Sequence, residues 1–212
     1  MKKLLFAVAA IVIFLPVRGQ FRYGLQGGVN LATLIAKNYN NSFAHNLFRP
    51  GFNASPFVEY ACWDYLSLKS ALILETKGTN ATYHSDTLKA NGSTNLLYLD
   101  IPLLAKGNFK VGVFTVFVDA GPYAGIGLTG RGKLVTPYSN ISRKIRWGKD
   151  YQDDFKRFDY GVMGGAGVQW NNVSLEATFV YGLANIYPLS QIGYIIEHRV
   201  VCLKVGYFFG SK

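Results

Sequence analysis

Apolar and polar residues alternate through eight separate segments of this 212-residue chain, which are residues 21–31, 51–60, 66–77, 97–106, 114–129, 159–170, 173–183 and 201–209. In the first segment the odd positions are mostly apolar or aromatic, whereas the even positions are polar or glycine. Such alternation predicts β-strands that have two different faces. Each segment is close to the 9–11 residues that a tilted strand needs to cross a bilayer. In the fifth segment we expect the polar face to include Gly127 and Thr129.

The connections between these segments alternate in length. Three are short, at residues 62–65, 107–112 and 171–172, and the others are long and polar, near residues 32–49, 78–93, 130–158 and 185–198. Short turns at one end and long loops at the other are typical of an outer-membrane barrel, whose short turns lie in the periplasm. We therefore predict an all-β fold: an eight-stranded antiparallel up-and-down transmembrane β-barrel with long extracellular loops.

Glycines on the polar faces argue against the rival fold, a secreted soluble barrel or sandwich with its apolar face inside. Glycine weakens a strand and brings no advantage on an open, solvated face. Inside an eight-stranded barrel space is narrow, and small residues must alternate with long ones. The polar-face glycines are Gly24, Gly28, Gly121, Gly125, Gly127, Gly161, Gly165, Gly167, Gly182 and Gly206. The polar face is therefore expected to line the lumen.

Aromatic residues gather near the segment ends, as the two interfacial girdles of a membrane barrel require. Those near the short turns are Phe21, Tyr23, Tyr60, Phe114, Trp170, Tyr207 and Phe209, and those toward the long loops are Phe52, Tyr160 and Tyr181. The low charged fraction, 16%, agrees with a surface that faces lipid.

Residues 1–19 read as a cleaved secretory signal peptide. Lys2 and Lys3 precede an apolar stretch of twelve residues, which is too short to span a bilayer as a helix. We expect residues 20–212 to form one outer-membrane β-barrel domain, located in the cell outer membrane.

Charged residues on the polar faces are nearly balanced, with six acids and five bases. They are Arg22, Glu59, Lys69, Glu75, Lys77, Asp100, Lys106, Asp119, Asp159, Glu176 and Lys204. We expect them to pair across a narrow lumen and plug it, because eight strands leave no open channel. The alternative is an ion path or a proton relay. Paired carboxylates in a filled interior do not indicate a glycosidase, because they leave no cleft for a sugar.

The third long loop carries eight basic residues against three acids, Asp150, Asp153 and Asp154. The basic residues are Arg131, Lys133, Arg143, Lys144, Arg146, Lys149, Lys156 and Arg157. Beside the outer leaflet they could bind lipid phosphates or an anionic surface or secretion partner; the plain alternative is a solvated loop. Export and the absence of any such fold disfavour nucleic-acid binding.

The three histidines, His45, His84 and His198, fall in three different long loops. Adjacent residues such as His84, Ser85 and Asp86 do not make a catalytic triad, since the side chains must converge in space. No catalytic residue, metal site or cofactor is predicted.

Several motifs resemble the PorT-like outer-membrane β-barrel family, also described as a porin family. They span the chain after the signal peptide, at residues 28–31, 49–52, 98–104, 119–125, 159–161, 164–167, 175–177, 181–186 and 205–209. The resemblance implies an outer-membrane barrel and no shared enzymatic reaction, and some relatives belong to a protein-secretion and gliding apparatus.

We therefore expect a non-enzymatic barrel with a structural or interaction role carried by its surface loops. The alternatives are a narrow porin-like pore or an accessory component of a secretion or gliding machine and, third, a barrel enzyme. Cys62 and Cys202 are expected to remain unpaired, because Cys62 lies at the periplasmic rim and Cys202 well above it. A disulfide needs Cα atoms within about 7 Å.

Overall fold

A computed structural model describes residues 21–37, 43–44, 47–85, 88–189 and 194–209 of the chain. The signal peptide predicted over residues 1–19 lies outside this part. Within it, no helix is long and apolar enough to cross a membrane. All of the named elements are β-strands, and every pairing between them is antiparallel.

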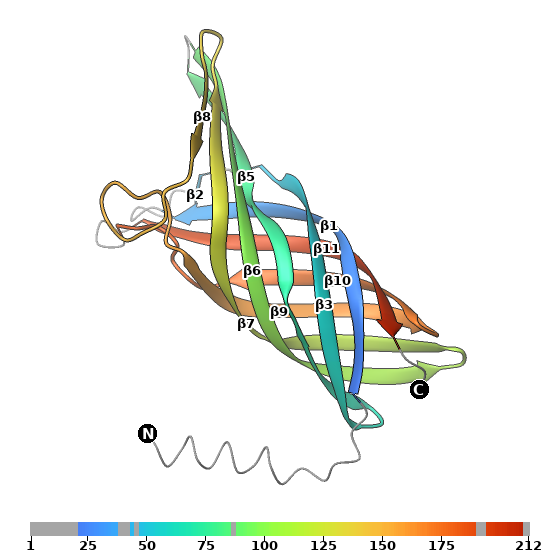
Figure 1. Ribbon diagram of the computed structural model, residues 1–212. Helices are drawn as coiled ribbons and strands as arrows, with labels where there is room; N and C mark the ends of the chain where they lie inside the picture. Colours follow the sequence, from blue (N-terminus) through green and yellow to red (C-terminus); the bar gives the residue numbers. More distant parts are fainter. Residues whose placement is uncertain (1–20, 38–42, 45–46, 86–87, 190–193, 210–212) are drawn as a thin grey trace, which may run out of the picture.

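The strands close into a ring of eight, which confirms the predicted fold (Figure 1). Around the ring they are β1 (Phe21–Lys37), β11 (Ile195–Phe209), β10 (Val173–Gly182), β9 (Phe158–Trp170), β7 (Phe114–Val135), β6 (Leu88–Val111), then β4 (Leu66–Ala71) with β5 (Ile73–Ser85), and β3 (Arg49–Trp63). β4 and β5 are two pieces of one ring strand, interrupted at Leu72. The ring closes where β1 pairs with β3, and two short strands, β2 (Phe43–Ala44) and β8 (Asn140–Lys144), pair with β1 and β7 outside it.

Side chains alternate between the outside and the lumen as the sequence pattern predicts. In β10 every second residue is exposed and every other one is buried, from Val173 to Gly182. The exposed side chains are apolar, such as Leu175 and Phe179, whereas Glu176 and Thr178 between them face inward. An apolar surface that faces outward over a whole barrel is stable only in lipid.

Glycines make room inside this narrow barrel. A Cβ atom placed on Gly167 would lie 2.5 Å from the Phe117 ring, and one placed on Gly24 would lie 2.6 Å from the Phe57 ring. A backbone carbonyl oxygen of the adjacent strand would be closer still in both cases. The rings and the neighbouring backbone therefore occupy the space that the glycines leave open. This close approach is the reason for glycine on the inward face, as expected for a filled eight-stranded barrel.

Two of the predicted long loops are partly wrong, because the strands continue into them. β5 runs on to Ser85 and β6 begins at Leu88, so most of residues 78–93 is strand; β7 likewise continues to Val135 and pairs with β8. At about 3.3 Å per residue, the 24-residue β6 is about 80 Å long, far more than a bilayer requires. Figure 1 shows these strands rising well beyond the ring as a continuation of the barrel sheet, which we call the protrusion (residues 79–85, 88–95, 130–135 and 140–144).

A β-bulge marks the base of the protrusion. Tyr98 pairs with Gly127 but Leu97 pairs with Thr129, so β7 contains one extra residue, Leu128. The bulge moves Thr129 to the exposed outer face, which corrects the expectation that Thr129 faces inward with Gly127. Bulges are common at barrel rims, where they re-aim the side chains that follow.

Candidate functional site

At the end of the lumen nearest the short turns, two ion pairs share Glu59. Glu59 accepts from Arg22 Nη2 at 2.6 Å through Oε1 and from Lys106 Nζ at 2.7 Å through Oε2. The Lys106 ammonium also lies 4.1 Å from the centre of the Phe117 ring, a cation–π distance. The charges of Arg22, Glu59 and Lys106 are therefore all paired at this end of the lumen.

A second group of ion pairs fills the next level of the lumen. Lys69 Nζ lies 2.5 Å from Glu176 Oε2 and 3.6 Å from Asp119 Oδ2, and Lys204 Nζ lies 3.6 Å from Glu176 Oε1. Thr178 donates its hydroxyl hydrogen to Glu176 Oε1 at 2.8 Å. These residues come from β4, β7, β10 and β11, so the ion pairs tie together strands that are distant in sequence.

The third group, toward the long loops, is centred on Lys77, whose side chain is fully buried. Its Nζ lies 2.7 Å from Asp100 Oδ2 and 2.9 Å from Asp159 Oδ2. Tyr123 donates its hydroxyl hydrogen to the same oxygen of Asp159, at 3.0 Å. The structure thus brings all five predicted lumenal bases into contact with lumenal carboxylates.

Glu75, the remaining lumenal acid, takes its partner from β11. Its Oε1 accepts a hydrogen bond from the buried Cys202 thiol at 3.1 Å. Cys62 instead lies at the end of β3, beside the short turn, and both cysteines are free thiols.

Apolar side chains cluster at the extracellular end of the lumen. Ile145 and Trp147, from the segment after β8, pack against Tyr98 inside the barrel, and the Tyr98 and Trp147 rings meet edge to face at 5.6 Å. The Lys156 backbone N–H also donates to the Ile186 carbonyl at 2.7 Å. We call this cluster the cap; it consists of Leu34, Leu96, Tyr98, Ile145, Trp147, Phe155, Ala184, Ile186 and Ile196.

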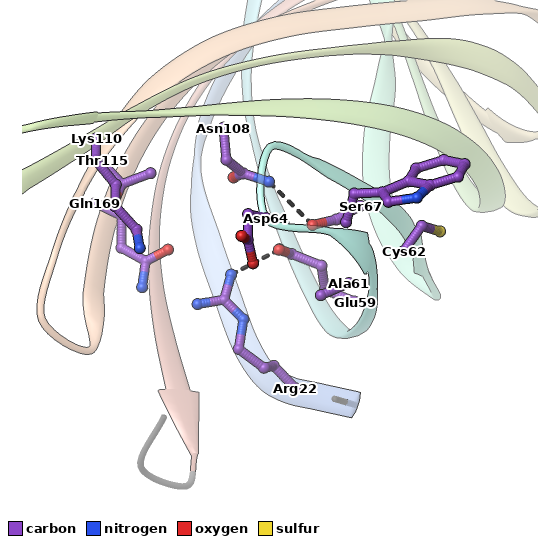
Figure 2. A pocket seen from close by; sticks show the side chains of 11 residues that line it. Arg22, Glu59, Ala61, Cys62, Asp64, Ser67, Asn108, Lys110, Thr115 and Gln169 are labelled. Carbon is purple, nitrogen blue, oxygen red and sulfur yellow. Dashed lines mark hydrogen bonds and ion pairs between the residues drawn. The ribbon is translucent and has the colours of Figure 1, made fainter. Parts of the chain in front are cut away.

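The other end of the lumen is an open polar vestibule of about 560 Å³ (Figure 2). Asn108 and Gln169 line it, and Asn108 donates from Nδ2 to the Ser67 hydroxyl oxygen at 2.9 Å. Arg22 and Glu59 also line it, so the first ion pair forms its inner end. The vestibule therefore opens on the short-turn side of the barrel.

The predicted basic loop divides into three parts in the structure. Arg131 and Lys133 lie on β7, and Lys144 lies on β8. Residues that stand opposite each other on paired strands share a face of the sheet. Arg131 stands opposite Lys144 and Lys133 stands opposite Ser142, so these side chains lie on one face. We call Arg131, Lys133 and Lys144 the basic outer face. Arg143 points to the inner face of the same sheet, where its Nη2 donates to Asp154 Oδ1 at 2.6 Å.

The remaining basic residues, Arg146, Lys149, Lys156 and Arg157, follow β8 in the segment that carries the cap. This part of the prediction, a polar connection outside the strands, agrees with the structure. The whole set does not form one patch, because β8 places alternate residues on opposite faces.

The histidines do not form a site in the described residues. His198 is fully buried on β11, where its ring meets the Tyr98 ring edge to face at 5.1 Å. His84 lies near the tip of β5, and His45 falls outside the described residues. No group of three or more His, Cys, Asp or Glu side chains suited to a metal ion occurs in the part of the chain that the structure describes.

Three lumenal aromatic residues were missed by the sequence analysis. Phe117, Tyr123 and Phe208 are all buried, and each lies within cation–π distance of a lumenal base. Their positions could have been found from the alternation alone, because Phe117 stands two residues before Asp119.

An eight-stranded antiparallel barrel with an apolar outer surface and an ion-paired lumen is the architecture of a bacterial outer-membrane barrel. The family comparison agrees with this class. The chain belongs to the family described as the outer membrane protein beta-barrel domain, whose model matches residues 16–187.

Solved structures with a similar fold include two bacterial proteins. The attachment invasion locus protein Ail of Yersinia pestis is 14% identical, with a TM-score of 0.43, and the match covers 90% of this chain and 99% of Ail. Neisserial surface protein A is 13% identical, with a TM-score of 0.42, and the match covers 87% of this chain and 96% of that protein. A search of curated proteins returned no match.

Proposed function

We propose that this protein is a non-conducting outer-membrane barrel that acts through its extracellular surface and has no enzymatic activity. The observation that carries the proposal is the filling of the lumen: three groups of ion pairs lie in series beneath the apolar cap. Apart from Glu59, which lines the vestibule, the lumenal carboxylates lie in a packed interior, where a substrate would have no cleft to enter.

The basic outer face is the part of the surface that we assign to binding. Arg131, Lys133 and Lys144 are exposed, and no ion pair to an acid is recorded for them within the described residues. Arg131 follows the lipid-facing Leu128 by only three residues, about 10 Å along the strand. This height suits the phosphate groups of outer-leaflet lipids, which guanidinium and ammonium groups bind well.

Planar-bilayer recording tests the closed lumen. The reconstituted wild-type protein should give no large, steady conductance, while a general porin in the same chamber serves as the positive control. A stable open channel would contradict the proposal and favour the narrow pore.

Thermal unfolding in lipid nanodiscs tests the basic outer face. Phosphatidic acid added to phosphatidylcholine discs should raise the Tm of the wild type, because a ligand that binds the folded state stabilises it. The variant R131Q/K133Q/K144Q should lose this rise, and the control R146Q/K149Q/R157Q should keep it. An equal rise in both variants would show that the outer face is not the binding surface.

Within the outer-membrane barrel family, we also propose that the chain belongs with the PorT-like barrels. The sequence motifs at residues 98–104 and 119–125 support this placement. Co-purification from intact membranes distinguishes a lone barrel from a component of a secretion machine.

A further inference from the structure

A second cavity, of about 620 Å³, lies at the extracellular end of the molecule. One wall is the inner face of the protrusion, formed by strands β5 to β8. The opposite wall is the barrel mouth, to which β1 contributes Leu34 and Ala36 and β11 contributes Ile196. Phe155 of the cap forms part of the lining. The cavity thus lies above the lumen, on the inner side of the protrusion, and shares only Lys133 with the basic outer face.

Most of the lining of this cavity is apolar and much of it is small. Ala81, Gly92 and Gly132 stand on three neighbouring strands of the protrusion, and Leu134 and Ile141 extend the same face. A Cβ atom placed on Gly132 would meet Ile145 Cδ1 at 3.6 Å and no other atom within 4 Å, so the surface at this point has room for a ligand. Burying an apolar chain here would remove hydrophobic surface from water.

The charge of the cavity comes from Arg143. The lining includes Arg143 and Lys133 and no acidic residue among those described. The register turns the Lys133 side chain to the outer face, so Arg143 is the base that points inward. A guanidinium has five N–H donors, and the contact with Asp154 uses one of them at 2.6 Å. Asp154 holds the guanidinium in place while donors remain for a ligand.

We propose that this cavity binds a single-chain amphiphile with an anionic head group, of the class of medium-chain carboxylates. The unbranched chain lies along the small and apolar side chains, and Arg143 binds the carboxylate. The volume is within the range of small-molecule sites, roughly 300–1,000 Å³. The inference does not depend on the proposed function, because it concerns the opposite face of the protrusion from Arg131, Lys133 and Lys144.

Dodecanoate binding to the full-length protein in phosphatidylcholine nanodiscs tests the site. Isothermal titration calorimetry, with empty nanodiscs as the blank, should show saturable binding of one dodecanoate per barrel. Acetate should not bind, because it lacks the chain. Dodecylammonium should bind at least about fivefold more weakly than dodecanoate, because its head group repels Arg143.

Two matched pairs of variants locate the site. Ala81→Trp fills the cavity and should weaken dodecanoate binding at least about tenfold, whereas Thr82→Trp, on the opposite face of the same strand, should leave it unchanged. Arg143→Gln should remove the preference for dodecanoate over dodecylammonium, and Lys144→Gln should keep it. The SDS-resistant migration of unboiled protein checks that each variant is folded.

Three results would overturn the proposal. One is uptake of dodecanoate that never saturates above the empty-disc blank, which means partition into the bilayer only. Another is equal binding by folded Ala81→Trp and Thr82→Trp variants. The third is wild-type protein that binds dodecylammonium as tightly as dodecanoate.

Discussion

The barrel wall and the protrusion are built from the same continuous strands, yet their two faces have opposite character. Along β7 the outward residues within the ring are apolar, as at Val116 and Val118, but beyond the bulge they are Arg131 and Lys133. The inward residues change in the other direction, from Asp119 in the lumen to Leu134 in the protrusion.

This reversal is explained by the different surroundings of the ring and of the protrusion. In the ring the outer face meets hydrocarbon, where a charged side chain is costly, and the polar side chains turn inward to pair. Above the membrane the outer face meets water and lipid head groups, so charges can be exposed there. The difference also predicts how each region responds to substitution. The stability of the ring should depend on the lumenal ion pairs and on side-chain packing, whereas exposed side chains of the protrusion should contribute little.

The largest effect is expected for a lumenal charge. Lys77→Met leaves Asp100 and Asp159 buried without their cation and should lower the free energy of unfolding by about 3–5 kcal/mol. Lys133→Met on the protrusion should change it by less than about 0.5 kcal/mol. Urea titration of the lipid-reconstituted proteins measures both. Equal losses would mean that the lumen is as solvated as the outer face.

A lipid-facing charge should come next. Leu103 is 57% exposed on the outside of β6, and Leu103→Arg should destabilise the barrel by about 2–4 kcal/mol if it lies near the bilayer midplane. Ser93→Arg, farther along the same strand in the protrusion, should be nearly neutral in the same titration. A neutral Leu103→Arg would refute the inside–outside assignment of β6.

Glycine substitutions give a smaller contrast. Gly167→Ala forces a methyl group toward the Phe117 ring and should cost about 1–3 kcal/mol, because the lumen is filled. Gly132→Ala, where the methyl group has room, should change stability by less than about 0.5 kcal/mol. The urea midpoints of the two glycine variants, measured in the same titration, test this contrast. A Gly167→Ala barrel of wild-type stability would show that the lumen is loosely packed.

Thiol accessibility should differ without any change in stability. Cys62, partly exposed near the vestibule, should react with maleimide in the folded protein, whereas Cys202, buried beside Glu75, should react only after unfolding. Mass spectrometry of labelled, unreduced protein counts the free thiols. A disulfide between them would contradict both the sequence prediction and the positions of the two residues.

The alternation of residues determined the ring and the inward or outward direction of most side chains. Side chains in a strand alternate between the two faces whatever the adjacent strands are, so the sequence alone shows this alternation. The short turns indicated which strands pair in sequence order. The same pattern selected the eleven lumenal charges, although it could not say that Lys77 would meet Asp159 from β9 or that Cys202 would meet Glu75. Such partners are set by the stagger of strands around the closed barrel.

The tertiary structure alone decided what happens above the membrane. Residues 78–93 are polar and contain Gly78 and Gly92, so the sequence by itself indicated a loop. In the structure residues 78–85 pair with residues 88–95 of β6, and β6 from Asn91 onward pairs with the extended β7. The bulge at Leu128 then reverses which residues face outward, and the cap folds Trp147 onto Tyr98. The sequence by itself determined the barrel because every strand repeats one local pattern. The protrusion, the cap and the cavity between them depend on contacts between distant segments, which no local pattern encodes.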